Sequence, residues 1–379
     1  MRTLRPLKVG LNLLHLVPGQ TGGSEIYARR LIPALLDGDG LDLVLFASRE
    51  GAPALRAEPW AGNAEIVELP VSGSSRGRRV LAEQTLLPRA ARRARIDLLH
   101  NLFTTAAVAP GVPQVTTILD LIYKRFPEAH SGVRSLGMRM LVPLSAKRST
   151  RIIAISEATK SDIVSFLGVD PSHVDVTYLA PGLGDAVDPA PEAALRERHS
   201  LGESPIVLSV SAHRPHKNLE RLIDAIAVLE RPFVLVVPGY ETRWEDEFAA
   251  HVRRRGVQER VRLIGWLGDA ELEGLYASAT CMAFPSLAEG FGLPVLEAMA
   301  RGLPVACSNA TSLPEVAGEA ALYFDPLDLP AMTGAIERLL GDAELRERLA
   351  AAGREQAARF TWERTAEGTR RSYERALAS

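Results

Sequence analysis

The sequence has little cysteine, no long apolar run and no excess of charge of either sign. Its 44 basic and 46 acidic side chains among 379 residues nearly balance. Global charge therefore gives no indication of nucleic-acid binding, and we expect no nucleic-acid partner. No segment approaches the ~18 consecutive apolar residues of a membrane-spanning helix. The first residues reach polar Asn12 and His15 before any apolar core, so we expect no signal peptide and a cytoplasmic location.

The two cysteines, Cys281 and Cys307, both lie in apolar runs typical of buried strands. This pattern favours free thiols in a reducing compartment over a disulfide. Neither cysteine has the spacing of a metal-ligand set. The single Asp-x-Asp sequence, Asp37-Gly-Asp39, falls between an expected helix and an expected strand and is typical of a turn. We therefore expect no metal site and no cofactor.

An alternation of apolar strands and amphipathic helices runs along the chain and stops once. The residues from Leu179 to Pro191 include three prolines and two glycines with little periodicity, which is typical of a linker. Strands are expected before it at 9–14, 43–47, 65–69, 98–100, 114–118, 151–155 and 174–178. After it they are expected at 206–211, 233–237, 261–264, 281–283, 305–307 and 321–324. This order predicts an α/β protein with two doubly wound parallel sheets, in domains 1–183 and 184–360.

Helices are expected in both domains at 24–36, 133–149, 157–167, 219–229, 245–255, 270–279, 330–340, 344–360 and 361–377, with Ser156 as a cap. A further helix is expected from Pro294, which suits a first helical position because it lacks an N–H donor. Gly290 and Gly292 precede it and allow a ligand to approach the backbone. Unpaired N–H groups at such a helix start attract an anion.

Two carboxylates, Glu289 and Glu297, flank that helix start eight residues apart. One anion pocket between two acidic acceptors suits a ligand that carries phosphate between two hydroxyl-bearing groups. A sugar nucleotide has that constitution. The residue pattern alone is also compatible with a strand, a turn and a helix with an acidic first turn.

The stretch from Phe284 to Pro304 resembles the two-glutamate signature of the family 4 retaining glycosyltransferases, which have the GT-B fold. The resemblance implies two facing Rossmann-like domains with a cleft between them, the first binding the acceptor and the second the nucleotide sugar. It also implies that Glu289 bonds the donor sugar hydroxyls and Glu297 the ribose diol. The backbone that would face the sugar and the diphosphate is that of Gly290, Phe291, Gly292 and Leu293.

A basic segment lies between another expected strand and helix. Its Arg214 and Lys217 resemble the family pair that binds the donor diphosphate, although a solvated basic loop would have the same composition. The neighbouring His213 and His216 are expected to be hydrogen-bonding loop residues. Without a metal ion, the two cations and helix N-termini would neutralise the leaving diphosphate.

The expected N-terminal domain carries two further candidate segments. Gly22 and Gly23 follow the first strand and precede a helix, as in a simple turn, and resemble a family loop that faces the donor phosphates and acceptor. Asp120 matches the aspartate of a family His-Asp pair, or it caps a strand end. Leu119 stands where the histidine is usual, which leaves sugar choice and full activity open.

Three further features of the sequence rest mainly on the resemblance. By family analogy the nucleobase lies against backbone at 265–267, so Gly265 and Trp266 are candidate contacts. Glu315 is either a site residue or an ordinary helix-start carboxylate. A Phe-x-Trp sequence at 360–362 resembles the family junction that returns the last helix, 361–379, to the N-terminal domain.

The segment from Arg76 to Arg95 contains seven arginines and one acidic residue, Glu83, interleaved with apolar residues. Such a segment can lie on an anionic membrane surface or can be a solvated helix face interrupted at Pro88. Because many family members act at the inner membrane face, peripheral membrane contact through this segment is a hypothesis.

The sequence predicts a metal-independent, retaining glycosyltransferase. We expect it to transfer a mannose-, glucose- or rhamnose-type sugar from a GDP- or UDP-sugar to a hydroxyl of a glycan or lipid-linked acceptor in cell-envelope polysaccharide synthesis. A non-catalytic donor-binding subunit, a sugar-nucleotide epimerase and a sugar-phosphate synthase remain alternatives. The sequence leaves the base, the sugar, the acceptor and the oligomeric state open.

Overall fold

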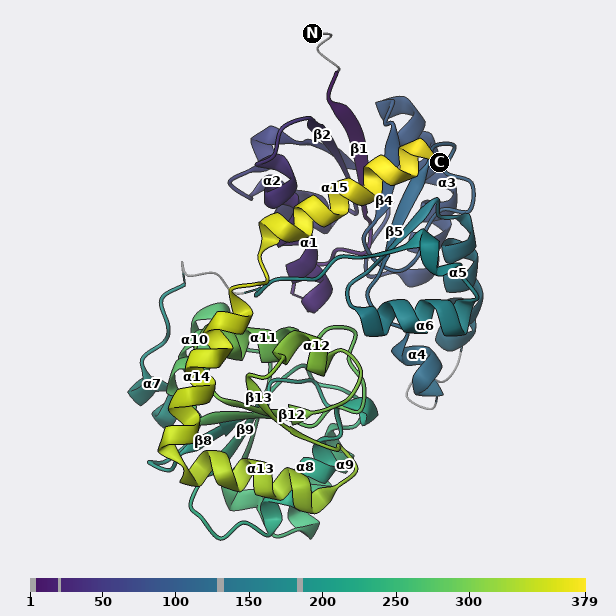
Figure 1. Ribbon diagram of the computed structural model, residues 1–379. Coiled ribbons are helices and arrows are strands. Elements are labelled where there is room, and N and C mark those ends of the chain that lie inside the picture. The colour runs from purple at the N-terminus through teal and green to yellow at the C-terminus, as the bar shows by residue number, and fades with distance from the viewer. Residues whose placement is uncertain (1–4, 20–21, 128–132, 183–186) are drawn as a thin grey trace. The chain divides into compact units, whose positions relative to one another are not determined.

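The chain forms two compact units in a computed structural model that describes residues 5–19, 22–127, 133–182 and 187–379 (Figure 1). The first unit comprises Met1–Gly182 with Thr361–Ser379, and the second comprises Leu183–Phe360. The boundary that we placed between residues 183 and 184 lies one residue from this division. Part of the predicted linker, 183–186, and part of the first glycine-containing loop, 20–21, lie outside the described residues.

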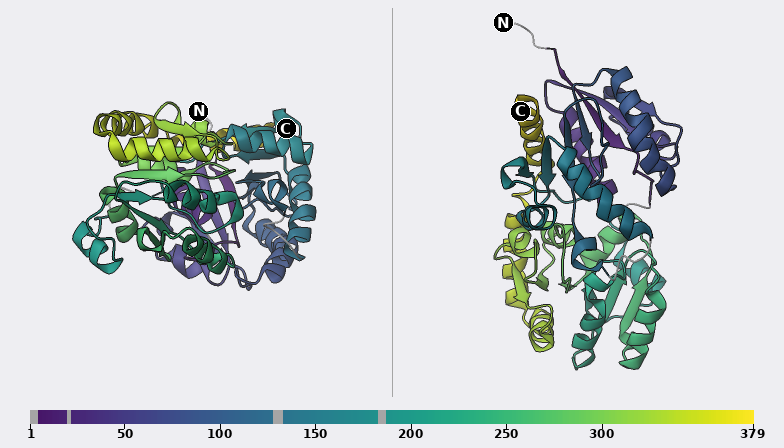
Figure 2. Two further views of the ribbon diagram at one scale, coloured as in Figure 1. Left: turned by 90° about the horizontal axis from the view of Figure 1, so that it is seen from below. Right: turned by 90° about the vertical axis from the view of Figure 1, so that its right-hand side faces the viewer.

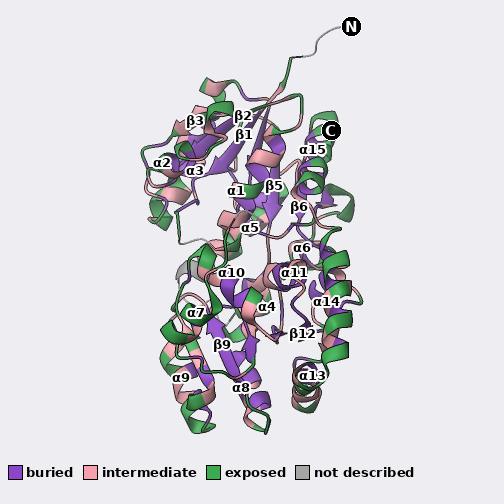
Figure 3. Cartoon of the chain, turned by 90° about the vertical axis from the view of Figure 1, so that its left-hand side faces the viewer, coloured by how far each residue is buried: buried purple, intermediate pink, exposed green. Residues whose placement is uncertain are grey.

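The first unit contains a seven-stranded parallel sheet in the order β3-β2-β1-β4-β5-β6-β7. Its strands are β1 (Leu7–Leu13), β2 (Leu41–Ala47), β3 (Glu65–Glu68), β4 (Leu98–Asn101), β5 (Gln114–Ile118), β6 (Arg151–Ala154) and β7 (Val174–Val176). The central strands are buried on both faces, as continuous apolar runs require. Figure 3 shows this burial along the strands of both units.

Helices cover both faces of the first sheet (Figure 1, Figure 2). They are α1 (Gly23–Leu36), α2 (Gly51–Arg56), α3 (Arg76–Ala94), α4 (Ile122–Arg125), α5 (Val133–Arg148), α6 (Glu157–Leu167) and α15 (Trp362–Ala378). Helix α15 packs beside α1 and against β5, β6 and β7. Right-handed crossovers place α3, α5 and α6 on the opposite face. The predicted cap of α6 is confirmed, because Ser156 Oγ accepts a bond from the Thr159 N–H at 2.9 Å.

A chain of buried hydrogen bonds fastens the C-terminal helix to the first sheet. His100 Nδ1 lies 2.8 Å from the hydroxyl of Tyr373 on α15, and His100 Nε2 lies 2.8 Å from Thr117 Oγ1. Thr117 is in turn 3.1 Å from the hydroxyl of Tyr27 on α1. Burial lowers the pKa of His100 to about 3, so the imidazole is neutral. Trp362 also donates to the carbonyl of Pro181 at 2.9 Å, so the predicted return of the last helix is confirmed.

The second unit contains a six-stranded parallel sheet in the order β10-β9-β8-β11-β12-β13. Its strands are β8 (Ile206–Leu208), β9 (Val234–Pro238), β10 (Val261–Ile264), β11 (Cys281–Phe284), β12 (Val305–Ser308) and β13 (Ala321–Phe324). Its helices are α7 (Glu192–Arg198), α8 (Leu219–Ala227), α9 (Glu245–Arg254), α10 (Asp269–Ser278), α11 (Leu293–Ala300), α12 (Leu313–Ala317), α13 (Leu329–Gly341) and α14 (Ala343–Ala357). Helix α13 packs with α8, whereas α14 packs with α11 and α12.

Both cysteines lie in the second sheet as buried free thiols, as the sequence predicts. Burial raises the pKa of Cys281 to about 12, so its thiol stays protonated at neutral pH. Among the described residues, no helix combines the length and apolarity needed to span a bilayer.

Each sheet has one point at which the strand order reverses. In the first unit β1 and β4 are neighbours there, and in the second unit β8 and β11 are neighbours. The loops that leave the carboxyl ends of such strands diverge and leave a crevice, where ligands bind in open α/β sheets. In the second unit these are the loops that carry the predicted basic segment and the two-glutamate stretch.

Several local predictions differ from the structure. Strand β8 ends at Leu208 instead of Ser211, and α11 begins at Leu293, so Pro294 occupies the second helical position. Helix α3 continues through Pro88, although we expected an interruption there. The short helices α2, α7 and α12 were not predicted, because few apolar positions define a helical period over five to seven residues.

Candidate active site

The centre of the candidate site is an ion pair between the two switch-point loops. Lys217 ends a 3₁₀ turn that follows β8, and its Nζ donates to Glu289 Oε1 at 2.6 Å. Glu289 follows β11. Both side chains are largely buried, and Lys217 Nζ also lies 5.6 Å from the ring centre of Phe284. The contact joins residues 72 positions apart because β8 and β11 are adjacent.

The loop that carries Lys217 is fixed by further bonds to its neighbours. The Leu287 N–H donates to the carbonyl of His216 at 2.7 Å. Asn218, in a left-handed conformation with φ 57°, donates to the carbonyls of Pro285 and Pro326. Arg214 is exposed and makes no ion pair with any residue in the described part of the chain. The Lys217 ammonium is therefore held in place, whereas Arg214 can reach a ligand from solvent.

His213 lies beside this loop and is engaged by the protein. Its Nδ1 is 2.5 Å from Glu245 Oε2, and its ring is 4.3 Å from that of Phe248. Burial lowers the pKa of His213 despite the neighbouring Glu245 carboxylate. His213 is thus a hydrogen-bonded loop residue, as predicted.

A third loop, which leaves β12, clamps the backbone around Glu289. Thr311 Oγ1 accepts a bond from the Glu289 N–H at 2.9 Å. Ser312 Oγ lies 3.1 Å from the carbonyl oxygen of Glu289 and 2.8 Å from that of Phe291. Thr311 has a φ of 49°, which is uncommon for a non-glycine residue. The backbone of the Gly290–Leu293 segment is therefore positioned by hydrogen bonds and not by its own sequence alone.

Gly292 provides the sharp entry into α11. It is the N-cap residue with φ 103°, a conformation that favours glycine, and no side chain caps the helix. The N–H groups of Val295 and Leu296 bond back to the Gly292 carbonyl at 3.0 and 3.2 Å. The start of α11 thus keeps the positive end of the helix dipole beside the loop of Glu289.

Glu297 lies in α11 and is buried, with 4% of its surface exposed. The hydroxyl of Tyr276, on α10, donates to Glu297 Oε2 at 3.0 Å. Burial, reinforced by the Glu297 carboxylate, raises the pKa of Tyr276 well above its ordinary value, so the phenol is a hydrogen-bond donor at neutral pH. Glu315 lies half-buried in the first turn of α12.

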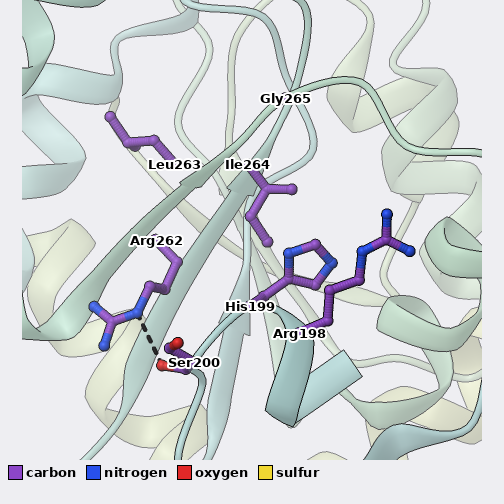
Figure 4. Close-up of a pocket in the computed structure, with 7 residues that line it drawn as sticks. All are labelled: Arg198, His199, Ser200, Arg262, Leu263, Ile264 and Gly265. Atoms are coloured by element: carbon purple, nitrogen blue, oxygen red, sulfur yellow. Dashed lines mark hydrogen bonds between the residues drawn. The ribbon is translucent and has the colours of Figure 1, made fainter. Parts of the chain in front are cut away.

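The predicted base contacts lie beyond β10. Trp266 is 56% exposed and stacks on Tyr240, with ring centres 4.4 Å apart and planes 15° apart. An open cavity of about 580 Å³ borders Gly265 (Figure 4). Its lining consists of Arg198, His199, Ser200, Arg262, Leu263, Ile264 and Gly265. The cavity therefore adjoins the predicted base region but does not include either glutamate.

The predicted residues of the first unit have local structural roles. Asp120 follows β5, and its Oδ1 accepts a bond from the Ile122 N–H at 3.0 Å at the start of α4. The Leu119 N–H is 3.5 Å from Thr104 Oγ1. Gly22 is the N-cap of α1 with φ 53°, and Gly23 is the first residue of that helix.

Three residues of this arrangement were not predicted as site residues. Thr311 and Ser312 lie in the loop after β12, at the ligand-binding edge of the sheet, and this position was the signal that could have identified them. Tyr276 is an apolar-face residue of α10 in the sequence, and nothing in the pattern indicates its bond to Glu297.

Comparison with known proteins identifies the family of this chain. A family profile described as "Glycosyl transferases group 1" matches residues 192–356, and one described as "Glycosyltransferase Family 4" matches residues 21–180. The O-antigen chain mannosyltransferase B of Escherichia coli is 34% identical over 266 residues, which are 68% of this chain and 69% of that protein. The chain belongs to glycosyltransferase family 4.

Solved structures place this glycosyltransferase in the GT-B fold class. The sucrose-phosphate synthase of Thermosynechococcus elongatus has a TM-score of 0.77 at 21% identity, covering 98% of this chain and 99% of that one. Anabaena HepE in complex with UDP-glucose has a TM-score of 0.74 at 20% identity, covering 97% and 99%. The predicted family, the α/β fold class and the enzyme class are thus confirmed.

Proposed function

We propose that this enzyme transfers a mannose-, glucose- or rhamnose-type sugar from a nucleotide-diphosphate donor to a hydroxyl of a glycan or lipid-linked acceptor in cell-envelope polysaccharide synthesis. The observation that carries the proposal is the Lys217–Glu289 pair beside the N-terminus of α11. A cation for phosphate and a carboxylate for sugar hydroxyls stand side by side there. The mannosyltransferase relative supports mannose, and the UDP-glucose complex of HepE supports a nucleotide sugar.

The proposed roles follow from the position of each group. Lys217, Arg214 and the N-terminus of α11 hold the donor diphosphate and take up the negative charge that grows on it as it leaves. Glu289 accepts hydrogen bonds from the donor sugar, and Glu297 accepts them from the ribose diol. Trp266 offers an aromatic surface to the base. We assign no metal ion to this chemistry, and the same groups act with a GDP or a UDP donor.

We propose that the sugar configuration is retained. The bond between the anomeric carbon and the diphosphate oxygen breaks, and its electron pair leaves with the diphosphate. The acceptor oxygen attacks the anomeric carbon from the same face, and a phosphate oxygen of the leaving group takes the acceptor proton. Asp120 and the Gly22-Gly23 loop belong to the first unit, which we assign to the acceptor.

Thermal unfolding in the presence of UDP, GDP and their common sugar conjugates tests the donor site. A nucleotide at about a hundred times its dissociation constant should stabilise the folded enzyme by ~2.7 kcal/mol. Nucleoside monophosphates serve as controls and should stabilise less, because they lack the second phosphate. A folded protein that none of these compounds stabilises would contradict the proposal. Binding without sugar transfer to any acceptor would favour the non-catalytic alternative and would draw attention to Leu119.

We also propose that helix α3 contacts an anionic membrane surface. Six of its arginines and the flanking Arg95 form the predicted basic segment, and those that are exposed are Arg76, Arg78, Arg89, Arg92, Arg93 and Arg95. Leu81 is 63% exposed among them, whereas Glu83 is buried beneath. Basic side chains around exposed apolar residues suit anionic lipid headgroups.

Co-sedimentation with phosphatidylglycerol-containing vesicles tests this contact. Reversing Arg89, Arg92 and Arg93 to Glu should reduce vesicle binding at least tenfold, since each basic residue near the surface contributes ~1 kcal/mol. Reversal of Arg253, Arg338 and Arg348, three exposed arginines of the second unit, is the matched control and should have little effect. Equal binding by both triple variants, or no binding by the natural sequence, would remove the membrane hypothesis.

A further inference from the structure

A buried polar cluster links α10 to α11 behind the proposed ribose carboxylate. Tyr276 is 1% exposed, and its hydroxyl donates to Glu297 Oε2 at 3.0 Å. The two residues are 21 positions apart and come from α10 and α11, the helices that precede and follow β11 in the sequence. A buried tyrosine hydroxyl needs a partner, and here that partner is a carboxylate oxygen of the site itself.

A second contact holds the Tyr276 ring. The guanidinium of Arg301, at the end of α11, lies 5.1 Å from the centre of that ring. Arg301 Nε donates to Glu273 Oε2 at 2.5 Å, and Arg301 Nη2 donates to Glu273 Oε1. This two-bond pair with a residue of α10 keeps the guanidinium in one plane against the ring.

Arg301 also contacts the main chain of Glu297. Its Nη1 donates to the Glu297 carbonyl oxygen at 2.8 Å, whereas its charge is matched by Glu273. The terminal torsion of a glutamate is broad, and the bond from the Tyr276 hydroxyl to Oε2 favours one plane for the Glu297 carboxylate.

We propose that Tyr276 is a positioning residue that orients Glu297 toward the two ribose hydroxyls and thereby makes the site select ribonucleotides over 2′-deoxyribonucleotides. The inference rests on the proposed role of Glu297 in donor binding. The two adjacent ribose hydroxyls can both donate to one carboxylate only when its two oxygens are held in a suitable orientation. Loss of the Tyr276 bond lets the carboxylate turn, and the 2′-hydroxyl then contributes less to binding.

Calorimetric titration of UDP, GDP and their 2′-deoxy forms into the full chain tests this inference. In the natural sequence the bound ribonucleotide should have a lower Kd than its 2′-deoxy form. In Tyr276→Phe its Kd should rise by about 5- to 50-fold, the range expected when a buried charged acceptor loses a partner. The Kd of the 2′-deoxy form should rise less, so the ratio of the 2′-deoxy Kd to the ribonucleotide Kd should fall at least threefold.

Two variants separate positioning from general destabilisation. Tyr323→Phe is the matched control, because the Tyr323 hydroxyl bonds the Gly318 carbonyl and has no bond to Glu297, so the ratio should not change. Arg301→Lys keeps a positive charge near Glu273 but removes the planar group over the Tyr276 ring. This change should lower the ratio less than Tyr276→Phe does, and it serves as a second folded variant.

The outcomes distinguish this inference from the donor site on which it rests. Equal rises in both Kd values, or an unchanged ratio in Tyr276→Phe and Arg301→Lys, would overturn the positioning role. If Glu297→Ala brought the two Kd values close to each other, the proposed donor site would still be supported even where the positioning role of Tyr276 was overturned. Glu297→Ala with unchanged Kd values, or no binding of either nucleotide to the natural sequence, would overturn the donor site and the inference together.

Discussion

Glu289→Gln should lower kcat by about 10²- to 10³-fold without weakening the binding of the free nucleoside diphosphate. The magnitude is that expected when one preorganised contact to the transition state, here from the donor sugar hydroxyls, is lost. In the structure Glu289 is bonded to Lys217 at 2.6 Å, so its carboxylate neutralises the cation that we assign to the diphosphate. Removal of the carboxylate charge leaves Lys217 more available to phosphate. The Kd of the diphosphate should therefore stay the same or fall while turnover is lost.

Lys217→Met should have the opposite effect on binding. It removes the buried cation and leaves Glu289 as an unpaired negative charge near the phosphate position. We expect the Kd of the nucleoside diphosphate to rise by about 10- to 100-fold, the range for a lost charged hydrogen bond. Calorimetric titration gives both Kd values, and initial rates with the donor identified by thermal unfolding give kcat.

Asp224→Asn is the matched control for these two variants. Asp224 lies on α8 and pairs with His251 and Arg255, without a bond to either switch-point loop. Its replacement removes a similar ion pair and should leave kcat and Kd unchanged. If Glu289→Gln and Lys217→Met shifted the diphosphate Kd in the same direction, Glu289 would act in diphosphate binding and not on the sugar.

Gly292→Ala is the second change with a large expected effect. Gly292 has φ 103°, and an added Cβ would lie 2.6 Å from Cδ2 of Leu313. Leu313 is fully buried, so it has little room to move. The strained backbone alone costs ~1–3 kcal/mol. We expect the free energy of unfolding to fall by at least that amount and nucleotide binding to be lost, because the same turn sets the start of α11.

Urea unfolding and nucleotide titration measure the two effects of Gly292→Ala. Gly334→Ala provides the control, because Gly334 lies inside α13 and an added Cβ meets no atom within 4 Å. That change should stabilise the helix by up to ~1 kcal/mol. If Gly292→Ala bound the nucleotide with its original Kd, the turn at Gly292 would not be part of the donor site.

The strand and helix pattern was largely predictable from the sequence because most elements carry a clear period. Strand β5 and helix α6 match the predicted ranges, since a run of β-branched residues defines the strand and a serine cap begins the helix. The predicted end of β8 lay three residues beyond Leu208, where the strand pairing ends. The N–H groups of Ser209 and Ser211 still donate to carbonyls of β9, so the backbone stays close to that strand beyond its end. The break expected at Pro88 was wrong because tertiary contacts bury that part of α3 and hold the helix together.

The sequence by itself determined the family, the α/β class and the residues from which we propose that the donor site is built. Those inferences depend on local spacing, such as eight positions between Glu289 and Glu297 or a glycine before a helix. Only the tertiary structure decided which of these residues meet. Lys217 reaches Glu289 because β8 and β11 are neighbours, and Tyr276 reaches Glu297 because α10 and α11 pack on one face. Such pairings arise from sheet order and packing, which no local pattern in the chain specifies.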